Sequence, residues 1–402
     1  MEPIVVTARG LLCEPDRLLE GGGVVVHGGR VRGLLDSRVA VGRAGFAVRD
    51  LGDVLLTPGM VNAHAHLELG ALGSELPADG GFVSWVEALI ARKSRVDAAG
   101  FARAVARGVE RLLAGGTTCV GDVDSTGAAW EICGRTGVRA RVYREVLDAG
   151  DESRTAGALE ELPRPPAEEC ESLQPGIAPH APYTVSPALF AACGELMRER
   201  GLACTVHWAE TEQEEAWVER GEGDFARLLT RSPGVSGLDA IEAAGLLGSG
   251  TSLVHANHAR PEERERIARA GAVVVHCPGT HAFFGRAPFD FSAWTAAGVE
   301  LALGTDSLAS NDTLDMGDEV ARVRAEAGLE PAAIWAMATL GGARAVGLAG
   351  AVGALVEGAW ADLVAWPWSG GDRDAALDAL TSGGLRPRSV SLAGREFSPR
   401  SS

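Results

Sequence analysis

At residues 61–66 the chain reads Val61-Asn62-Ala63-His64-Ala65-His66, just after the turn Thr57-Pro58-Gly59. Because side chains alternate along a strand, both imidazoles of a His-x-His pair at a strand end point to the same face. Two neutral imidazoles on one rigid edge form half of a metal site. Alone, the pair fits two ordinary histidines beside a turn equally well, so its meaning depends on what the rest of the chain places beside it.

From this stretch onwards, short apolar runs alternate with segments of helical periodicity. Helical spacing of apolar residues appears at 82–95, 101–114, from Pro187, and at 261–270, 290–297, 315–327 and 331–346. The runs that predict strands begin at Thr57 and then cover 117–123, 138–146, 172–180, 203–207, 251–255, 272–276 and 299–306. Eight short strands separated by helices predict a parallel sheet closed into a (β/α)8 TIM barrel, which we assign to residues 57–352.

Both ends of the chain differ from this central part. Residues 4–6 and 24–26 are β-branched runs beside glycine-rich turns, and residues 353–355, 361–366 and 389–393 again have strand character. We therefore expect residues 1–56 and 353–402 to pack together as one small β-sandwich domain. The fold class predicted from the sequence is α/β, a barrel with a small β-sandwich built from both chain ends.

Composition restricts the partners and the compartment. The chain has 402 residues, of which 46% are hydrophobic, and a net charge of −17. Such a negative field repels nucleic acid and anionic membrane surfaces, so a small-molecule substrate is the expected partner. Seven scattered cysteines without a Cys-x-x-Cys motif, and no recognisable signal peptide or transmembrane run, indicate a cytoplasmic protein. The oligomeric state is left open, with a homodimer as one option.

Several predicted strands end in a side chain that can bind a metal or exchange a proton: His66, His180, His207, His255, His276 and Asp306. Active sites of such barrels lie at the C-terminal strand ends. Glu210 follows His207 by three residues and can act as a general base beside a ligand. Taken singly, Glu210 fits a carboxylate at a helix N-terminus and Asp306 a helix N-cap. His180 and His276 likewise fit core histidines, but together these residues favour one metal site.

The combination of residue types indicates the chemistry. Three imidazoles with one carboxylate suit Zn²⁺ or Fe²⁺ with a position left for water. Such a metal lowers the pKa of its water towards about 7, and a nearby carboxylate can carry a proton to the leaving side of the substrate. The sequence therefore predicts a metal-dependent hydrolase.

Four separated motifs resemble the amidohydrolase superfamily: residues 58–66 (PGMVNAHAH), 207–210 (HWAE), His255 and 304–307 (GTDS). The pattern Gly358-x-x-Ala361-Asp362-Leu363-Val364 extends the resemblance over essentially the whole chain. The resemblance implies one divalent metal ion held by four ligands: His64, His66, His207 and Asp306. It also implies that Glu210 is the proton shuttle and that His255 orients the attacking water or hydrogen-bonds the developing oxyanion. Asp306 would be both ligand and base.

The resemblance also indicates the branch. Binuclear branches place a carboxylated lysine or a glutamate on the fourth strand, and residues 175–180 (PGIAPH) offer neither, so a mononuclear centre of the deaminase-like or chlorohydrolase-like kind follows. Residues 180–186 (HAPYTVS) resemble enzymes that deaminate adenine-containing nucleosides. There His180 would contact the ribose or the leaving edge of the substrate. Trp85 would stack on the base or is simply a core aromatic, and Arg144 would clamp a substrate carboxylate or pair with a neighbouring acid.

The closest detailed similarity is to the aminodeoxyfutalosine deaminases of the futalosine route to menaquinone. It is carried by residues 66–69 (HLEL), 276–278 (HCP), 281–285 (HAFFG) and 305–311 (TDSLASN), which add Glu68 and Ser307 to the candidate substrate contacts. The related methylthioadenosine and adenosylhomocysteine deaminases usually have a ribose-binding glutamate about nine residues after the tryptophan, whereas residues 91–95 (ARKSR) contain no acid. This departure leaves basic side chains near the expected pocket, which suits a benzoate-bearing substrate. Gly279-Thr280 departs from the Arg-Ser pair expected before His281.

The predicted reaction is hydrolytic deamination of an adenine-type nucleoside, in which activated water adds to C6, Glu210 delivers a proton to N1 and ammonia leaves. The alternatives are a deaminase of adenosine, adenosylhomocysteine or methylthioadenosine, and a chlorohydrolase-type enzyme acting on another heterocycle. A barrel that has lost its catalytic ligands is disfavoured because all six expected groups are present. The other zinc deaminase pattern, His-x-Glu followed by Pro-Cys-x-x-Cys, is absent.

Overall fold

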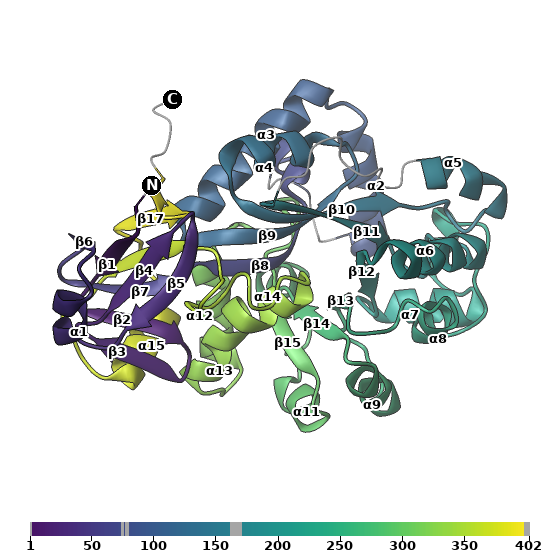
Figure 1. Ribbon diagram of the computed structural model, residues 1–402. Coiled ribbons are helices and arrows are strands. Elements are labelled where there is room, and N and C mark those ends of the chain that lie inside the picture. The colour runs from purple at the N-terminus through teal and green to yellow at the C-terminus, as the bar shows by residue number, and fades with distance from the viewer. Residues whose placement is uncertain (1, 74–75, 77–79, 161–170, 398–402) are drawn as a thin grey trace.

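The computed structural model describes residues 2–73, 76, 80–160 and 171–397. Its centre is a sheet of eight strands: β8 (Met60–Ala65), β9 (Thr117–Asp124), β10 (Arg139–Val146), β11 (Leu173–Pro179), β12 (Ala203–Trp208), β13 (Thr251–His255), β14 (Val273–His276) and β15 (Glu300–Leu303). Neighbours pair in parallel and in chain order, and a parallel bridge between Ala65 and Asp306 joins the last strand to the first. The predicted (β/α)8 barrel is confirmed (Figure 1).

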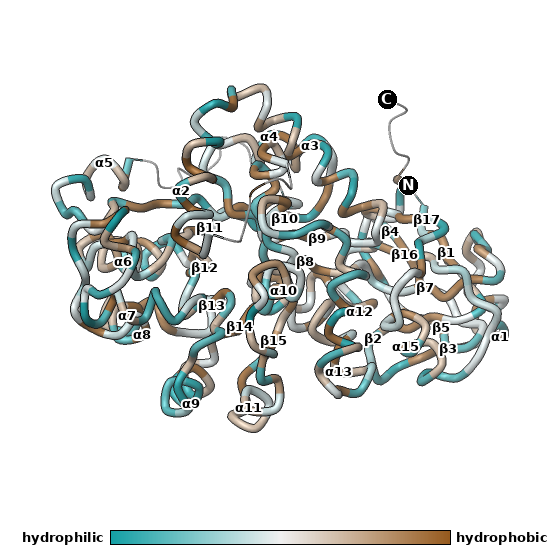
Figure 2. Tube along the Cα trace, turned by 180° about the vertical axis from the view of Figure 1, so that it is seen from behind, coloured by the Kyte–Doolittle hydropathy of each residue, from teal (hydrophilic) through white to brown (hydrophobic). Residues whose placement is uncertain are grey.

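Helices surround this sheet at the places predicted from periodicity. They include α2 (Phe82–Lys93), α3 (Ala98–Ala114), α6 (Pro187–Arg200), α9 (Pro261–Ala270), α11 (Phe291–Ala296), α12 (Met316–Glu326) and α13 (Pro331–Ala336). In α3, Val105, Val109 and Leu112 lie on one face and are fully buried, and the Asp97 side chain caps the N-terminus by accepting from the Gly100 amide. The outer α9 is mostly hydrophilic, as Figure 2 shows, because only one of its faces is covered.

Two further sheets contain the chain ends. The first has the order β5 (Arg30–Leu35), β4 (Gly23–His27), β1 (Ile4–Thr7), β6 (Ala47–Asp50). The second has the order β18 (Arg395–Glu396), β17 (Ser389–Leu392), β16 (Leu363–Pro367), β7 (Val54–Pro58), β2 (Gly10–Glu14), β3 (Arg17–Glu20). Buried residues of both sheets form one hydrophobic cluster, in which Val6 and Val24 meet Leu11 and Leu56. The predicted β-sandwich from both chain ends is therefore present.

The first predicted barrel strand begins later than expected. Thr57 and Pro58 end β7, because they pair with Val364 and Leu363 of β16 in the terminal sheet. Gly59 then turns the chain, and a Cβ there would lie within 1.9 Å of the Thr118 hydroxyl. The barrel strand β8 accordingly starts at Met60, so one continuous apolar run serves two sheets.

The C-terminal part departs from the prediction in two ways. Residues 353–355 do not form a strand, because Gly353 adopts a left-handed φ of 77° against the Thr339 carbonyl. A helix without a counterpart in the predicted elements, α15 (Arg373–Thr381), buries Leu377 and Leu380 and contacts α12 and α13. The division into a barrel of residues 57–352 and a domain of residues 1–56 and 353–402 stays a prediction.

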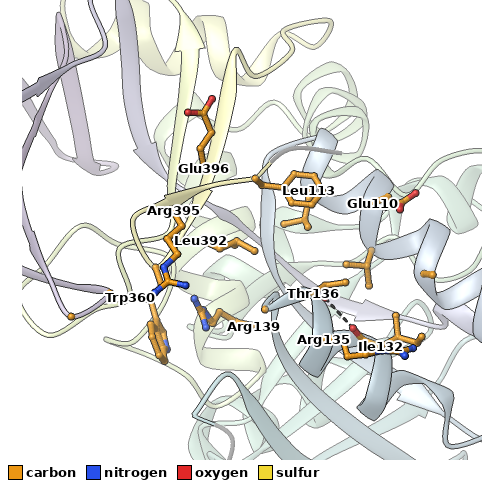
Figure 3. Close-up of a pocket in the computed structure, with 17 residues that line it drawn as sticks. Glu110, Leu113, Ile132, Arg135, Thr136, Arg139, Trp360, Leu392, Arg395 and Glu396 are labelled. Carbon is orange, nitrogen blue, oxygen red and sulfur yellow. Dashed lines mark hydrogen bonds between the residues drawn. The ribbon is translucent and has the colours of Figure 1, made fainter. Parts of the chain in front are cut away.

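A buried ion pair links the terminal sheets to the barrel. Arg139, the first residue of β10, donates two hydrogen bonds to the Asp362 carboxylate, at 2.9 and 3.0 Å. The Trp360 ring lies between the guanidinium groups of Arg139 and Arg30, at 3.8 and 3.6 Å. A cavity of about 1010 Å³ lies beside this junction (Figure 3). Since it adjoins the N-terminal end of β10, it lies at the end of the barrel opposite the candidate site.

Two sequence expectations concern the compartment. Among the described residues, no helix combines the length and the apolar character needed to cross a membrane. Six cysteines are buried free thiols: Cys13, Cys119, Cys133, Cys193, Cys204 and Cys277. Cys170 lies outside the described residues.

Candidate metal centre and active site

Five of the predicted site residues come together at the C-terminal ends of the barrel strands: His64, His66, His207, His255 and Asp306. The Nε2 atoms of His66 and His207 lie 3.2 Å apart. The Asp306 Oδ1 lies 3.8 Å from the Nε2 atoms of both His64 and His66. Two triads, one of His64, His66 and His207 and the other of His64, His255 and Asp306, each have ligand atoms within 4.8 Å of one another.

The hydrogen bonds around this cluster leave lone pairs for a cation. The Nδ1 of His207 lies 3.0 Å from the His180 carbonyl oxygen, which can only accept, so this nitrogen carries the proton and Nε2 has a lone pair. That lone pair faces His66. Both ring nitrogens of His64 are buried and have no hydrogen-bond partner among the described residues. A buried polar atom without a partner is costly, and a metal ion would satisfy several here at once.

Burial also keeps these imidazoles neutral. Loss of solvent and the neighbouring imidazoles lower the pKa of His64, His66 and His255 well below the usual range, and burial lowers the pKa of His207 to about 4. Burial, with the nearby Glu210 carboxylate, raises the pKa of Asp306 to about 7. Neutral imidazoles are the form that binds a metal, so the donor set fits one divalent cation.

The backbone around the cluster adopts conformations that L-residues rarely take. Ala209, His255, Ala256 and Asp306 have φ values of 50°, 73°, 52° and 56°. All four lie at or just after the ends of strands β12, β13 and β15. Such residues cost of order 1–3 kcal/mol each and persist where the surroundings enforce them, commonly at functional sites. The left-handed turns direct the side chains of His255 and Asp306 into the cluster.

The predicted proton shuttle, Glu210, lies next to the cluster and is held on several sides. Its Oε2 is 3.6 Å from the His255 Nε2, and its Oε1 accepts from the Arg286 Nη2 at 2.7 Å. Its backbone amide donates to Glu214 at 2.8 Å, and its carbonyl oxygen accepts from the Asn257 amide at 3.0 Å. The side chain is buried, so it can act on a substrate only within an enclosed site.

Two candidate substrate contacts, Trp85 and Glu68, are largely engaged with protein. Trp85 donates from Nε1 to the Ala309 carbonyl at 3.2 Å, and its ring meets the Phe284 ring edge-on at 5.3 Å. It thus covers the loops that follow β8 and β15. Glu68 accepts from Lys93 at 3.0 Å and from the Thr126 hydroxyl at 2.7 Å. Burial acts to raise the pKa of Glu68, but Lys93 and the hydroxyl donors hold it below the ordinary value.

The other three candidates lie around the same strand ends. The His180 Nδ1 is 2.7 Å from the Thr184 hydroxyl, and its ring centroid is 4.9 Å from that of His207. Arg144, on β10, donates to the Asp124 carbonyl at 3.3 Å. Ser307, next to Asp306, is buried and accepts from the Ala309 amide at 3.2 Å.

His276 takes no part in the clusters of metal-binding atoms found among the described residues. Its ring stacks on Phe289 at 4.1 Å and packs against Phe291 and His281. This is the environment of a core histidine, one of the two interpretations considered from the sequence.

Two residues near the site were not anticipated, Glu214 and Arg286. Lys93 belongs to the stretch 91–95, whose basic side chains the sequence predicts near the pocket, and it pairs with Glu68 at 3.0 Å. Glu214, in the first turn of α7 (Glu212–Arg220), lies four residues after Glu210 and accepts from the backbone amides of both Ala209 and Glu210. Its four-residue spacing from Glu210 was the only sequence feature that could have identified Glu214 as a neighbour of the site. Arg286 reaches the site through the turn that follows α10 (Pro278–Phe283), for which the sequence pattern carries no indication.

The amidohydrolase family matches this chain over residues 55–386. The chain belongs to the amidohydrolase family. Aminodeoxyfutalosine deaminase of Deinococcus radiodurans is 32% identical over 348 residues, covering 81% of this chain and 81% of that protein. The 5-methylthioadenosine/S-adenosylhomocysteine deaminase of Nitratidesulfovibrio vulgaris is 30% identical over 369 residues, covering 87% of this chain and 79% of that protein.

The same relationship holds for solved structures. A crystal structure of an adenosine deaminase from Xanthomonas campestris with bound zinc has a TM-score of 0.81 and 25% identity, covering 98% of this chain and 92% of that one. The resemblance expected from the sequence motifs is thereby confirmed at the level of the family. As an amidohydrolase with deaminase relatives, the protein is a hydrolase that acts on carbon–nitrogen bonds.

Proposed function

We propose that this amidohydrolase is a metal-dependent nucleoside deaminase, with aminodeoxyfutalosine as the favoured substrate. The observation that carries the proposal is the pair of buried triads of potential ligands that share His64, with a buried carboxylate, Glu210, alongside. The 32% identity to an aminodeoxyfutalosine deaminase supports the substrate class.

Four residues would hold one divalent cation: His64, His66, His207 and Asp306. Zinc is the favoured ion and Fe²⁺ the alternative, since three imidazoles with one carboxylate suit both. A metal bound there supplies water whose pKa is lowered towards about 7. The donor chemistry fits because the imidazoles are held neutral, both His64 ring nitrogens have no hydrogen-bond partner among the described residues, and the Nε2 atoms of His66 and His207 lie 3.2 Å apart.

The chain's own residues would then move two protons. Asp306 takes a proton from the attacking water, which adds to C6 of the adenine ring. Glu210 delivers a proton to N1, and His255, 3.6 Å from the Glu210 carboxylate, orients the water or hydrogen-bonds the developing oxyanion. The proton on Asp306 then passes to the amino group, which leaves C6 as ammonia, while the C6 hydroxyl returns a proton to Glu210 and becomes a carbonyl, so that one amine is exchanged for one oxygen.

The substrate contacts follow the same assignment. Trp85, which packs on the loops that follow β8 and β15, would stack on the base. His180 would contact the ribose or the leaving edge of the substrate. Arg144 would bind a substrate carboxylate. Glu68 and Ser307, both buried, would support this pocket, Glu68 through its ion pair with Lys93.

A second candidate is deamination of methylthioadenosine or adenosylhomocysteine. The relative at 30% identity favours it. Against it stands the stretch 91–95, which has no acid where those enzymes usually have the ribose-binding glutamate. Dechlorination of another heterocycle by the same centre is the more distant alternative.

An ammonia-release screen with the metal-loaded protein tests the proposal. It compares aminodeoxyfutalosine, adenosine, methylthioadenosine, adenosylhomocysteine and guanine at equal concentration. Highest kcat/KM with aminodeoxyfutalosine supports the assignment. Highest kcat/KM with methylthioadenosine or adenosylhomocysteine transfers it to the second candidate. Ammonia release from none of these compounds, together with chloride release from a chlorinated triazine in a separate assay, refutes nucleoside deamination.

A further inference from the structure

Arg286 occupies an unusual position beside the proposed proton shuttle. It lies three residues after α10 (Pro278–Phe283), and its side chain is only 10% exposed. Its Nη2 donates to the Glu210 Oε1 at 2.7 Å. Its other terminal nitrogen, Nη1, is buried without a hydrogen-bond partner among the described residues. A buried guanidinium with a donor left unpaired costs stability, so the position needs an explanation beyond the ion pair.

The turn that carries Arg286 is built to hold it there. Its backbone amide donates to the His281 carbonyl at 3.2 Å, and its guanidinium carbon lies 4.6 Å from the centre of the Phe284 ring. The His281 Nε2 is 2.6 Å from the Ala287 carbonyl oxygen, which closes the same turn. Phe284 in turn contacts Trp85, so Arg286 lies between the proposed base-stacking residue and the proton shuttle.

Glu210 is otherwise restrained mainly through its backbone. Glu214 binds its amide and Asn257 its carbonyl oxygen, which orient the residue but not its carboxylate. His255 lies 3.6 Å from Oε2, longer than a hydrogen bond. Arg286 therefore supplies the short contact that fixes one carboxylate oxygen and leaves the other turned towards the metal cluster.

We propose that Arg286 is a positioning and substrate-binding residue of the deaminase. Through Nη2 it fixes the Glu210 carboxylate, and through Nη1 it donates a hydrogen bond to an acceptor atom of the nitrogen heterocycle that Glu210 protonates. The planar fork of an arginine can make both bonds at once, whereas a lysine ammonium on a flexible stem cannot hold this planar geometry. The proposal rests on the proposed function, because both bonds act on the same substrate ring.

The test measures kcat and KM separately for Arg286→Gln and Arg286→Lys with a nucleoside that the wild-type protein deaminates. In Arg286→Gln, we expect kcat/KM to fall roughly 100-fold or more, as for loss of one preorganised charged donor. Arg286→Lys should keep kcat within about 10-fold of the wild-type value, since a cation still faces Glu210. Its KM should be higher than that of the wild type, because the donor to the substrate ring is gone. Added guanidine should restore at least part of the lost rate of Arg286→Gln. Metal content should match the wild type.

Arg264 provides a matched control. It also lies over an aromatic ring, that of Trp294 at 5.4 Å, and has a buried nitrogen, Nε, without a partner, but it lies on the outer helix α9. We expect Arg264→Gln to leave kcat and KM unchanged and to show no response to guanidine. A merely structural role for Arg286 would give no guanidine rescue and no separation of kcat from KM.

The outcomes separate this inference from the function on which it rests. If the wild type deaminates the nucleoside and both Arg286 variants have kcat and KM values within about twofold of the wild-type values, the role of Arg286 alone is overturned. The role of Arg286 is also overturned if the lower rate of both variants is accounted for by a lower metal content or a lower melting temperature. Absence of nucleoside turnover by the metal-loaded wild type would overturn both proposals.

Discussion

The Nε2 atoms of His66 and His207 lie 3.2 Å apart, although 141 residues separate them in the chain. Their rings are nearly parallel, with an interplanar angle of 18° and centroids 5.2 Å apart. The proton of His207 is on Nδ1, towards the His180 carbonyl, so its Nε2 lone pair faces His66. Two buried imidazoles in this arrangement are satisfied by a shared cation.

Removal of the metal should weaken the fold as well as stop the reaction. A ligand that binds only the folded state stabilises it by RT ln(1 + [L]/Kd), about 4 kcal/mol at a thousandfold excess over Kd. A chelator should therefore lower the melting temperature, and one equivalent of Zn²⁺ per chain should restore it. Recovery only after a second equivalent would contradict a mononuclear centre.

Asp306→Asn should reduce both the metal content and the rate, since it removes the one carboxylate in the ligand set. We expect kcat to fall by several orders of magnitude while the far-ultraviolet circular dichroism is unchanged. Asp312→Asn is the control, because Asp312 lies six residues further on, is exposed, and pairs with Arg322. Unchanged metal analysis together with unchanged kinetics in Asp306→Asn would remove this residue from the site.

Asp362 should be important for stability and unimportant for chemistry. Asp362→Ala leaves the buried Arg139 guanidinium without its partner, which typically costs about 3–5 kcal/mol in the free energy of unfolding. Asp378→Ala, in the same C-terminal region, removes an exposed partner of Arg324 and should cost less than about 1 kcal/mol. Urea titration of both variants measures the loss in the free energy of unfolding. Equal losses would show that the buried Arg139–Asp362 pair contributes no more to stability than an exposed ion pair.

His180 should make the stability of the metal-free protein depend on pH. Burial lowers the pKa of His180 from 6.5 to about 4, so between these values the unfolded chain binds a proton that the folded chain does not. The free energy of unfolding therefore falls as the pH drops through this interval, by roughly 1.4 kcal/mol per pH unit for this group.

His180→Asn lacks this contribution. Its free energy of unfolding should decline less steeply from pH 6.5 to pH 5 than that of the wild type, and the two slopes should agree above pH 7. Parallel curves throughout the range would mean that His180 is not held neutral in the folded state.

Sequence patterns predicted the parts of this protein that depend on periodicity and strand ends. The strands 117–123 and 251–255 lie within a residue of their observed ends, because buried parallel strands are continuous apolar runs. The pattern also placed the metal-binding side chains at one end of the barrel, since the strands are parallel. The run from Thr57 was assigned wholly to the barrel because hydrophobic pattern alone cannot distinguish two sheets that share one continuous strand.

Contacts that arise from tertiary packing could not be predicted from periodicity. Arg286 approaches Glu210 only through a closed turn, and Lys93 finds Glu68 only through packing of α2. Glu68 matched a motif, yet its carboxylate is occupied by Lys93, Ser125 and Thr126, which periodicity does not reveal. Helix α15 was missed because its buried face is short.

The most direct measurement compares ammonia release from aminodeoxyfutalosine by the zinc-loaded wild type and by Glu210→Gln, with zinc content determined for both. We expect one zinc per chain in each protein, rapid release by the wild type, and a kcat lower by roughly 10²–10⁴ in the variant, the usual contribution of a general acid–base group. Near-normal release by a zinc-loaded Glu210→Gln would contradict the account, because the chemistry would then not pass through Glu210.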